Sequence, residues 1–167
     1  IEKFTKLLGN LREVGITTVC FNFMAHYGWT RTSKELPERG GSLVTGFRLS
    51  DFEDDGFVLT AKKLRENFDY FIRAVLPEAE KAGVRLAIHP DDPPLCELGG
   101  VARIFTSLEK IKRAVDRYSS PYFGVTFCQA CYQLMGEDLE NAIRTLADKI
   151  FFVHFRNVRG TKTDFSE

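Results

Sequence analysis

Apolar residues along the chain follow two different spacings. Four stretches repeat an apolar residue every three to four positions, which predicts amphipathic helices. They are the segment before Gly15 and residues 61–82, 107–118 and 138–146. Four short runs between them are rich in β-branched and aromatic residues and predict strands. They are residues 16–23, 86–88, 122–127 and 150–153. Helices and strands therefore alternate, which predicts parallel strands joined by crossover helices.

The number of strands narrows the fold class. A closed (β/α)8 barrel needs eight strands and typically about 250 residues, whereas this chain has 167 residues and four predicted strands. An open doubly wound sheet usually carries a glycine-rich phosphate loop after its first strand, and none follows residues 16–23. We therefore expect α/β architecture, with residues 1–167 forming one domain, the central part of a (β/α)8 TIM barrel cut at both ends. Residues 28–60 are expected to be a long functional or disordered loop.

Three predicted strands run directly into a side chain that can bind a metal. His89 follows residues 86–88, Cys128 follows residues 122–127, and His154 follows residues 150–153. In parallel α/β folds the carboxyl ends of the strands meet at one rim, where ligands bind. Imidazole and thiolate suit Fe(II), Zn(II) or Mn(II) better than Mg(II) or Ca(II). We expect a metal site with an open coordination position, which is typical of a catalytic site.

Candidate substrate contacts lie beside these ligands. Side chains alternate along a strand, so Arg156 should face the same side as His154 and could bind a carboxylate. By the same parity Asp91 should share a side with His89, although Pro90 weakens this argument. Asn22, Trp29 and Arg31 follow the end of the first strand. Trp29 and Arg31 fit substrate contact about as well as a packed loop anchor.

Several other polar features fit structural roles. Cys128 and Cys131 form a CxxC sequence, which taken alone is a weak signal for a redox pair. His26 more simply lines the pocket or packs against Trp29. The acidic run at residues 51–55 is most simply a solvated loop.

Composition excludes several classes of function. Lys plus Arg and Asp plus Glu both number 23, so the net charge is zero. A binder of nucleic acid or of an anionic membrane needs a basic excess, so we expect neither partner. No apolar run approaches the length of a membrane span. The four cysteines are expected to be reduced thiols in a cytoplasmic protein, because no secretory signal is evident. The sequence leaves open whether the protein forms a homo-oligomer.

Five segments resemble the metal-dependent, xylose-isomerase-like mannonate dehydratase family. They are CFNFM with WTRT (20–32), KLRENF (63–68), IHPDDPP (88–94), GVTFC (124–128) and HFRNV (154–158). The resemblance implies a hydro-lyase of hexuronate catabolism that removes water from D-mannonate to give 2-keto-3-deoxy-D-gluconate with Mn(II) or Fe(II). It implies that His89, Cys128 and His154 bind the metal and that the chain supplies strands three to six of eight. For such a substrate, the positions of Arg156 and Arg31 make them the candidates to hold the carboxylate.

The chain departs from the family pattern in two places. Gln129, Ala130 and Cys131 stand where the family usually has a Thr-Gly-Ser-like run. The family's fourth metal ligand, an Asp, and its catalytic His would lie beyond Glu167, and Asp164 is in the wrong context to replace that Asp. Residues 1–167 alone are therefore expected to be inactive. The alternatives are another barrel enzyme of the same superfamily, such as a sugar isomerase or phosphodiester hydrolase, or a truncated domain without activity.

Overall fold

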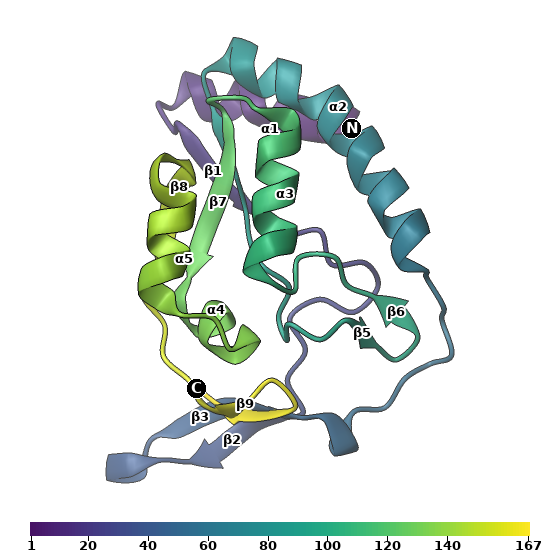
Figure 1. Ribbon diagram of the computed structural model, residues 1–167, viewed down its shortest axis with the longest axis vertical. Helices are drawn as coiled ribbons and strands as arrows, with labels where there is room; N and C mark the ends of the chain where they lie inside the picture. Colours follow the sequence, from purple (N-terminus) through teal and green to yellow (C-terminus); the bar gives the residue numbers. More distant parts are fainter.

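Four parallel strands form the central sheet of the computed structural model, which describes all 167 residues. They lie in the order β1-β4-β7-β8, which is also their order along the chain (Figure 1). Their bounds are β1 (Thr18–Phe21), β4 (Arg85–Ile88), β7 (Phe123–Cys128) and β8 (Ile150–His154). Parallel neighbours added one after another at the same edge are the pattern of a (β/α)8 barrel. The predicted fold class, part of such a barrel, is confirmed.

Helices alternate with the parallel strands as the periodicity predicts, the first before β1 and the others between consecutive strands. They are α1 (Glu2–Glu13), α2 (Ala61–Ala82), α3 (Leu108–Tyr118) and α5 (Leu139–Leu146). Each of the last three begins after a side-chain cap, because Thr60, Ser107 and Asp138 accept a hydrogen bond from the backbone N–H three residues ahead. None of these helices is both long and apolar enough to cross a membrane.

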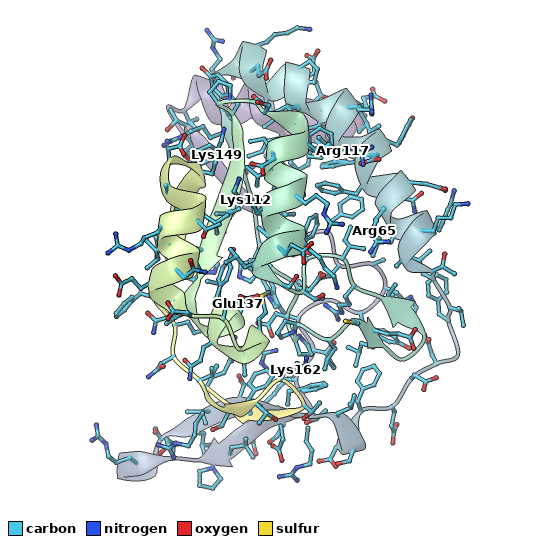
Figure 2. All side chains as sticks on the ribbon, in the orientation of Figure 1. Arg65, Lys112, Arg117, Glu137, Lys149 and Lys162 are labelled. Carbon is cyan, nitrogen blue, oxygen red and sulfur yellow. The ribbon has the colours of Figure 1, made fainter.

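The main core lies between the sheet and the helices that cover it. A single cluster of 21 buried residues joins the apolar faces of α2 and α3 to β4 and β7, with Ile72, Leu86 and Phe123 among its fully buried members. Charged side chains such as Arg65 and Arg117 lie on the outer side of this helix layer and are exposed (Figure 2). Buried apolar area of this kind is the main source of stability for the layer that holds the strand ends in place.

A second, antiparallel sheet replaces most of the loop expected at residues 28–60. Its strands are β2 (Ser33–Pro37), β3 (Leu43–Arg48), β9 (Arg159–Thr161) and β10 (Asp164–Ser166), in the order β2-β3-β10-β9. Short 3-10 helices, Arg39–Gly41 and Leu49–Asp51, follow β2 and β3. The prediction of a loop was wrong because β3 is stabilised by distant residues, with Phe47 paired to Phe165 in β10. Figure 1 shows this sheet beyond the carboxyl ends of the parallel strands.

Three smaller elements were also absent from the prediction. Residues 95–106 contain the hairpin of β5 (Glu97–Leu98) and β6 (Val101–Ala102). Its turn consists of Gly99 and Gly100, both with positive φ (52° and 75°), a conformation that glycine adopts without strain. Helix α4 (Gln129–Met135) begins directly after Cys128, and a 3-10 helix, Ala147–Lys149, precedes β8. Helix α4 bears on the site, because it brings Cys131 back towards the strand end.

Candidate metal centre and its arginine neighbours

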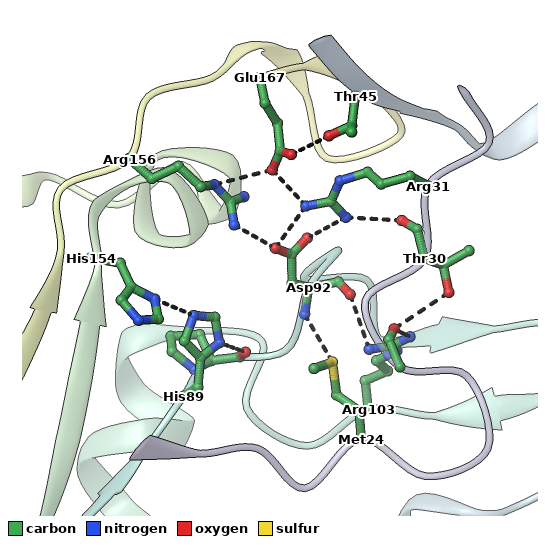
Figure 3. A network of polar contacts seen from close by, with 12 residues as sticks. Met24, Thr30, Arg31, Thr45, His89, Asp92, Arg103, His154, Arg156 and Glu167 are labelled. Carbon is green, nitrogen blue, oxygen red and sulfur yellow. Dashed lines mark hydrogen bonds and ion pairs between the residues drawn. The ribbon is translucent and has the colours of Figure 1, made fainter. Parts of the chain in front are cut away.

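His89 lies immediately after β4 and is 2% exposed. Its Nδ1 is 2.6 Å from the carbonyl oxygen of Pro90. A carbonyl oxygen only accepts hydrogen bonds, so Nδ1 carries the proton and Nε2 presents its lone pair. Nε2 lies 3.1 Å from Nδ1 of His154 at the end of β8 (Figure 3). The backbone carbonyl therefore fixes the tautomer of His89 that can bind a metal through Nε2.

Two sulfur atoms lie beside His89. Cys128 ends β7, is fully buried, and pairs in register with His154 on β8. Cys131, also fully buried, lies three residues further along in α4. One donor atom from each of His89, Cys128 and Cys131 lies within 4.8 Å of the other two. The structure thus adds Cys131 to the neighbourhood of the predicted ligands, a residue that the sequence indicated only through the weak CxxC signal.

The two thiols have opposite electrostatic environments. A hydrogen bond with Cys131 and contact with His89 lower the pKa of Cys128 to about 4, although burial opposes this shift. The same hydrogen bond and burial raise the pKa of Cys131 well above its usual value. These opposite shifts favour ionisation of Cys128 before Cys131. A thiolate is the form of cysteine that binds metals.

A neutral cluster of two arginines and two carboxylates lies next to these groups (Figure 3). The carboxylate of Asp92 is fully buried and accepts hydrogen bonds from Nη1 and Nη2 of Arg31, at 3.1 and 3.0 Å, and from Nη1 of Arg156, at 2.7 Å. Glu167 accepts from Nη2 of Arg31 at 2.6 Å and lies 3.2 Å from Nε of Arg156. Thr45 of β3 also donates a hydrogen bond to Glu167. We call Arg31, Asp92, Arg156 and Glu167 the arginine cluster.

The arginine cluster fixes the charge of Asp92. Burial favours the neutral acid, but hydrogen bonds from Arg31 and the charges of Arg156 and Arg31 outweigh it and hold the pKa of Asp92 below its usual value. The carboxylate of Asp92 is therefore ionised at neutral pH. Nη2 of Arg156 is buried and makes no hydrogen bond within the protein. Arg156 thus keeps one donor available for a ligand.

Asp91 has a different location from the one that strand parity predicts. Its carboxylate accepts a hydrogen bond from the backbone N–H of Phe105 at 2.6 Å and is 1% exposed. Burial raises its pKa. Pro90 interrupts the strand, so the alternation of sides does not extend beyond His89. The carboxylate that meets the arginines belongs to Asp92, whereas the carboxylate of Asp91 is held by the backbone of Phe105.

The remaining candidates lie around the rim. Trp29 is 55% exposed and packs edge-to-face against His89, with ring centroids 5.4 Å apart. Asn22 accepts a hydrogen bond from the backbone N–H of Met24 at 3.3 Å, which is a local turn contact. His26 was expected to line the pocket or to pack against Trp29. It instead stacks on Phe57 and hydrogen-bonds Asp55 at 2.7 Å, so one member of the acidic run has a specific partner.

Comparison with known proteins identifies the family. The model of the family described as D-mannonate dehydratase (UxuA) matches residues 1–60 and 52–167. The chain belongs to the D-mannonate dehydratase family. It is 34% identical over 201 residues to mannonate dehydratase of Streptococcus agalactiae and 33% identical over 202 residues to that of Thermotoga maritima. These alignments cover 100% and 96% of this chain but only 57% and 55% of the relatives.

Solved structures agree with this family assignment. The crystal structure of mannonate dehydratase from Streptococcus suis superposes with a TM-score of 0.89 at 34% identity, covering 99% of this chain and 50% of that chain. A 3-keto-D-glucoside 4-epimerase from E. coli superposes with a TM-score of 0.61 at 13% identity, which shows a shared fold alone. The chain thus spans about half the length of the mannonate dehydratases that it matches.

Proposed function

We propose that the protein carrying this chain is a metal-dependent hydro-lyase that converts D-mannonate to 2-keto-3-deoxy-D-gluconate and water. Membership of the D-mannonate dehydratase family supports this proposal. The observation that carries it is the position of His89 at the carboxyl end of β4, 3.1 Å from His154 at the end of β8 and within 4.8 Å of Cys128 at the end of β7, together with the spare donor of Arg156. Four free cysteines suit a reducing compartment, so we place the reaction in the cytoplasm as part of the same proposal.

The donor set fits the metal that the family resemblance implies. A neutral imidazole with its tautomer fixed, a thiolate and a second imidazole are ligands for Mn(II), Fe(II) or Zn(II). In this proposal His89, Cys128 and His154 hold the ion. When bound, it acts as a Lewis acid that polarises substrate oxygens. Burial of His89 and Cys128 keeps these two ligands out of contact with solvent.

The arginine cluster provides the recognition of the sugar acid in this proposal. Nη2 of Arg156 donates to the substrate carboxylate, while Asp92 and Glu167 hold the guanidinium in place. A guanidinium held in this way loses less conformational entropy when substrate binds. Arg31, on the other side of Asp92, supports the same geometry. Trp29, which packs against His89, covers the exposed side of the site.

Dehydration removes the proton at carbon 2 and the hydroxyl at carbon 3, so it requires an acid and a base. Donation to the carboxylate by Arg156 favours loss of the carbon-2 proton, because it stabilises the negative charge that develops next to the carboxylate. The family resemblance places the catalytic His beyond Glu167. In this proposal the residues of this chain bind and orient the substrate, and proton transfer belongs to residues further along.

Metal-dependent turnover of D-mannonate tests the proposal. The purified protein is stripped of metal, reloaded anaerobically with Mn(II) or Fe(II), and assayed for the 2-keto-3-deoxy acid. We expect product only after reloading. His89→Ala and His154→Ala should lose both bound metal and activity, while His26→Ala, the control at the third histidine, keeps both. Equal activity in the metal-free protein, or isomerisation of an aldose in place of dehydration, would overturn the proposal.

A further inference from the structure

We propose that Cys131 is a second thiolate ligand at this metal site, and that His89, Cys128 and Cys131 together make the site prefer Zn(II) over Mn(II). The inference rests on the metal site proposed above. It goes beyond the ligand set that the family resemblance implies, because a different, Thr-Gly-Ser-like run usually stands at residues 129–131 in that family. Cys131 is therefore a feature of this chain that the proposed reaction does not yet explain.

Helix geometry places the two sulfurs together. Cys128 is the residue before α4 and Cys131 is the third residue of that helix, so their side chains are one turn apart on the same face. Because β7 runs directly into α4 with no loop between them, this spacing is fixed by regular backbone at both ends. The two sulfur atoms lie within 4.8 Å of each other at the strand end.

The distances approach those of a coordination shell. Zinc binds sulfur at about 2.3 Å and imidazole nitrogen at about 2.0–2.1 Å, which in a tetrahedron separates the ligand atoms by roughly 3.3–3.8 Å. In this structure the donor atoms of His89, Cys128 and Cys131 all lie within 4.8 Å of one another. That limit exceeds the tetrahedral spacing by about 1.0–1.5 Å. Nδ1 of His154 lies 3.1 Å from Nε2 of His89.

Charge balance favours two thiolates over one. Cys128 and Cys131 are both fully buried, so an uncompensated charge at this position would carry a large desolvation penalty. A divalent ion bound by two thiolates and a neutral His89 has no net charge. The same ion with Cys128 alone keeps one positive charge, close to the guanidinium of Arg156, which is near enough to influence both thiols.

Ligand chemistry then determines which metal binds best. Thiolates favour Zn(II), whereas carboxylates, carbonyls and water favour Mn(II). A site with one nitrogen ligand and two sulfur ligands is therefore expected to bind Zn(II) more tightly than Mn(II). The simpler role for Cys131 is packing, because it lies in a buried cluster with Ala130 and Leu134 on the same short helix. Packing alone, however, would leave metal preference independent of the Cys131 sulfur, which gives a direct test.

The test counts thiolate ligands in the cobalt-substituted protein. The full-length protein is stripped, kept reduced and anaerobic, and loaded with Co(II). The near-ultraviolet absorption from thiolate-to-cobalt charge transfer rises with the number of bound sulfurs. We expect Cys131→Ser and Cys131→Ala to show about half the wild-type intensity. Cys96→Ser, at an exposed thiol, is the matched control and should keep the full intensity.

Metal competition provides a second, independent measurement. With a chromophoric chelator, the ratio of Zn(II) to Mn(II) affinity should fall by more than about tenfold in both Cys131 variants, because even loss of an outer-shell partner typically costs that much. Circular dichroism of the metal-free variants checks that they fold, and the alanine variant excludes weak ligation by the serine hydroxyl.

The outcomes separate this inference from the proposed function. Full charge-transfer intensity and an unchanged Zn(II)/Mn(II) ratio in both Cys131 variants would show that Cys131 only packs, provided that His89→Ala and Cys128→Ser still lose the cobalt spectrum. A cobalt spectrum that survives in His89→Ala and Cys128→Ser as well would overturn the metal site itself. A Cys128–Cys131 disulfide that persists under reductant would also overturn the ligand role of Cys131.

Discussion

Asp92→Asn is the sharpest test of the arginine cluster, because it removes one charge and keeps the shape of the side chain. In the wild-type protein the carboxylate of Asp92 is fully buried and receives three hydrogen bonds from Arg31 and Arg156. The amide that replaces this carboxylate can accept from one guanidinium at most on its oxygen side, and its NH2 group faces donors. Two positive charges then depend on Glu167 alone.

The exposure of each partner sets the expected size of the effect. Removing one member of a buried ion pair typically costs about 3–5 kcal/mol, because the other charge is left buried without a counter-ion. Two features reduce the cost here. Glu167 still contacts both arginines, and the side chains of Arg31 and Arg156 are 11% and 26% exposed, so water can solvate them in part. We therefore expect the free energy of unfolding to fall by about 3 kcal/mol, the lower end of the range.

Denaturant unfolding as a function of pH gives the assay. The folded-state pKa of Asp92 lies below its usual value, so its contribution to stability is complete above about pH 4, the unfolded pKa of an aspartate, and is lost as the pH falls through the folded pKa. The gap between wild type and Asp92→Asn should stay constant from about pH 5 to 8 and narrow below about pH 4. Glu140→Gln removes an exposed pair with Arg144 and should change stability by less than about 0.5 kcal/mol.

Two results would refute this reasoning. If Asp92→Asn is as stable as Glu140→Gln at neutral pH, the buried carboxylate is not needed to hold the two guanidiniums. If the stability gap persists unchanged well below about pH 4, the lost contribution does not come from ionised Asp92.

Two further changes test the substrate donor and the spacing of the strands. Arg156→Ala should lower kcat/KM on D-mannonate by about 100-fold, because a preorganised donor is lost. It should leave metal content unchanged, since a guanidinium cannot bind a metal ion. Loss of metal in this variant would contradict the assignment. Gly124→Ala should lower the free energy of unfolding by about 1–3 kcal/mol, because its Cβ would lie 2.3 Å from the backbone oxygen of Lys149 and force β7 away from β8. Gly9→Ala in α1 is the control, because a Cβ at this position meets nothing within 4 Å. It should raise the free energy of unfolding by about 0.5–1 kcal/mol, measured for both variants by denaturant titration. Equal losses of stability in the two variants would contradict the steric argument.

Local patterns predicted the elements that depend on local interactions. Helix α2 begins and ends where its periodicity and its cap Thr60 indicate, because the apolar stripe and the capping hydroxyl belong to the same segment. The parallel strands were found for a similar reason, since each contains a short apolar run, and the runs of β4 and β7 are buried. Residues 33–48 have no such run. Their sheet depends on pairing with residues 164–166, which lie more than 100 residues away in the sequence. A local pattern of apolar residues therefore cannot predict this pairing.

The same distinction holds for the candidate site. His89, Cys128 and His154 were selected by position alone, as the first polar residues after apolar strands, and two of them meet within hydrogen-bonding distance. Asp92 and Glu167 were missed, because their roles appear only when Arg31 and Arg156 arrive from distant segments. A signal for Asp92 did exist. Asp92 is the second of two adjacent carboxylates after Pro90, at the end of a buried strand. A carboxylate buried there needs a positively charged or hydrogen-bonding partner.

The arginine cluster connects four segments that are far apart in the sequence. Arg31 follows β1, Asp92 follows β4, Arg156 follows β8, and Glu167 follows β10 of the antiparallel sheet. Because two cations and two anions cancel, the cluster orients guanidiniums without giving the site a positive charge. A sugar acid that enters brings one negative charge to a neutral, largely buried site, which is costly unless a cation compensates it. The metal should therefore bind before the acid binds tightly. Arg156 then orients the acid's carboxylate, but it adds little net electrostatic attraction because its charge is balanced within the cluster.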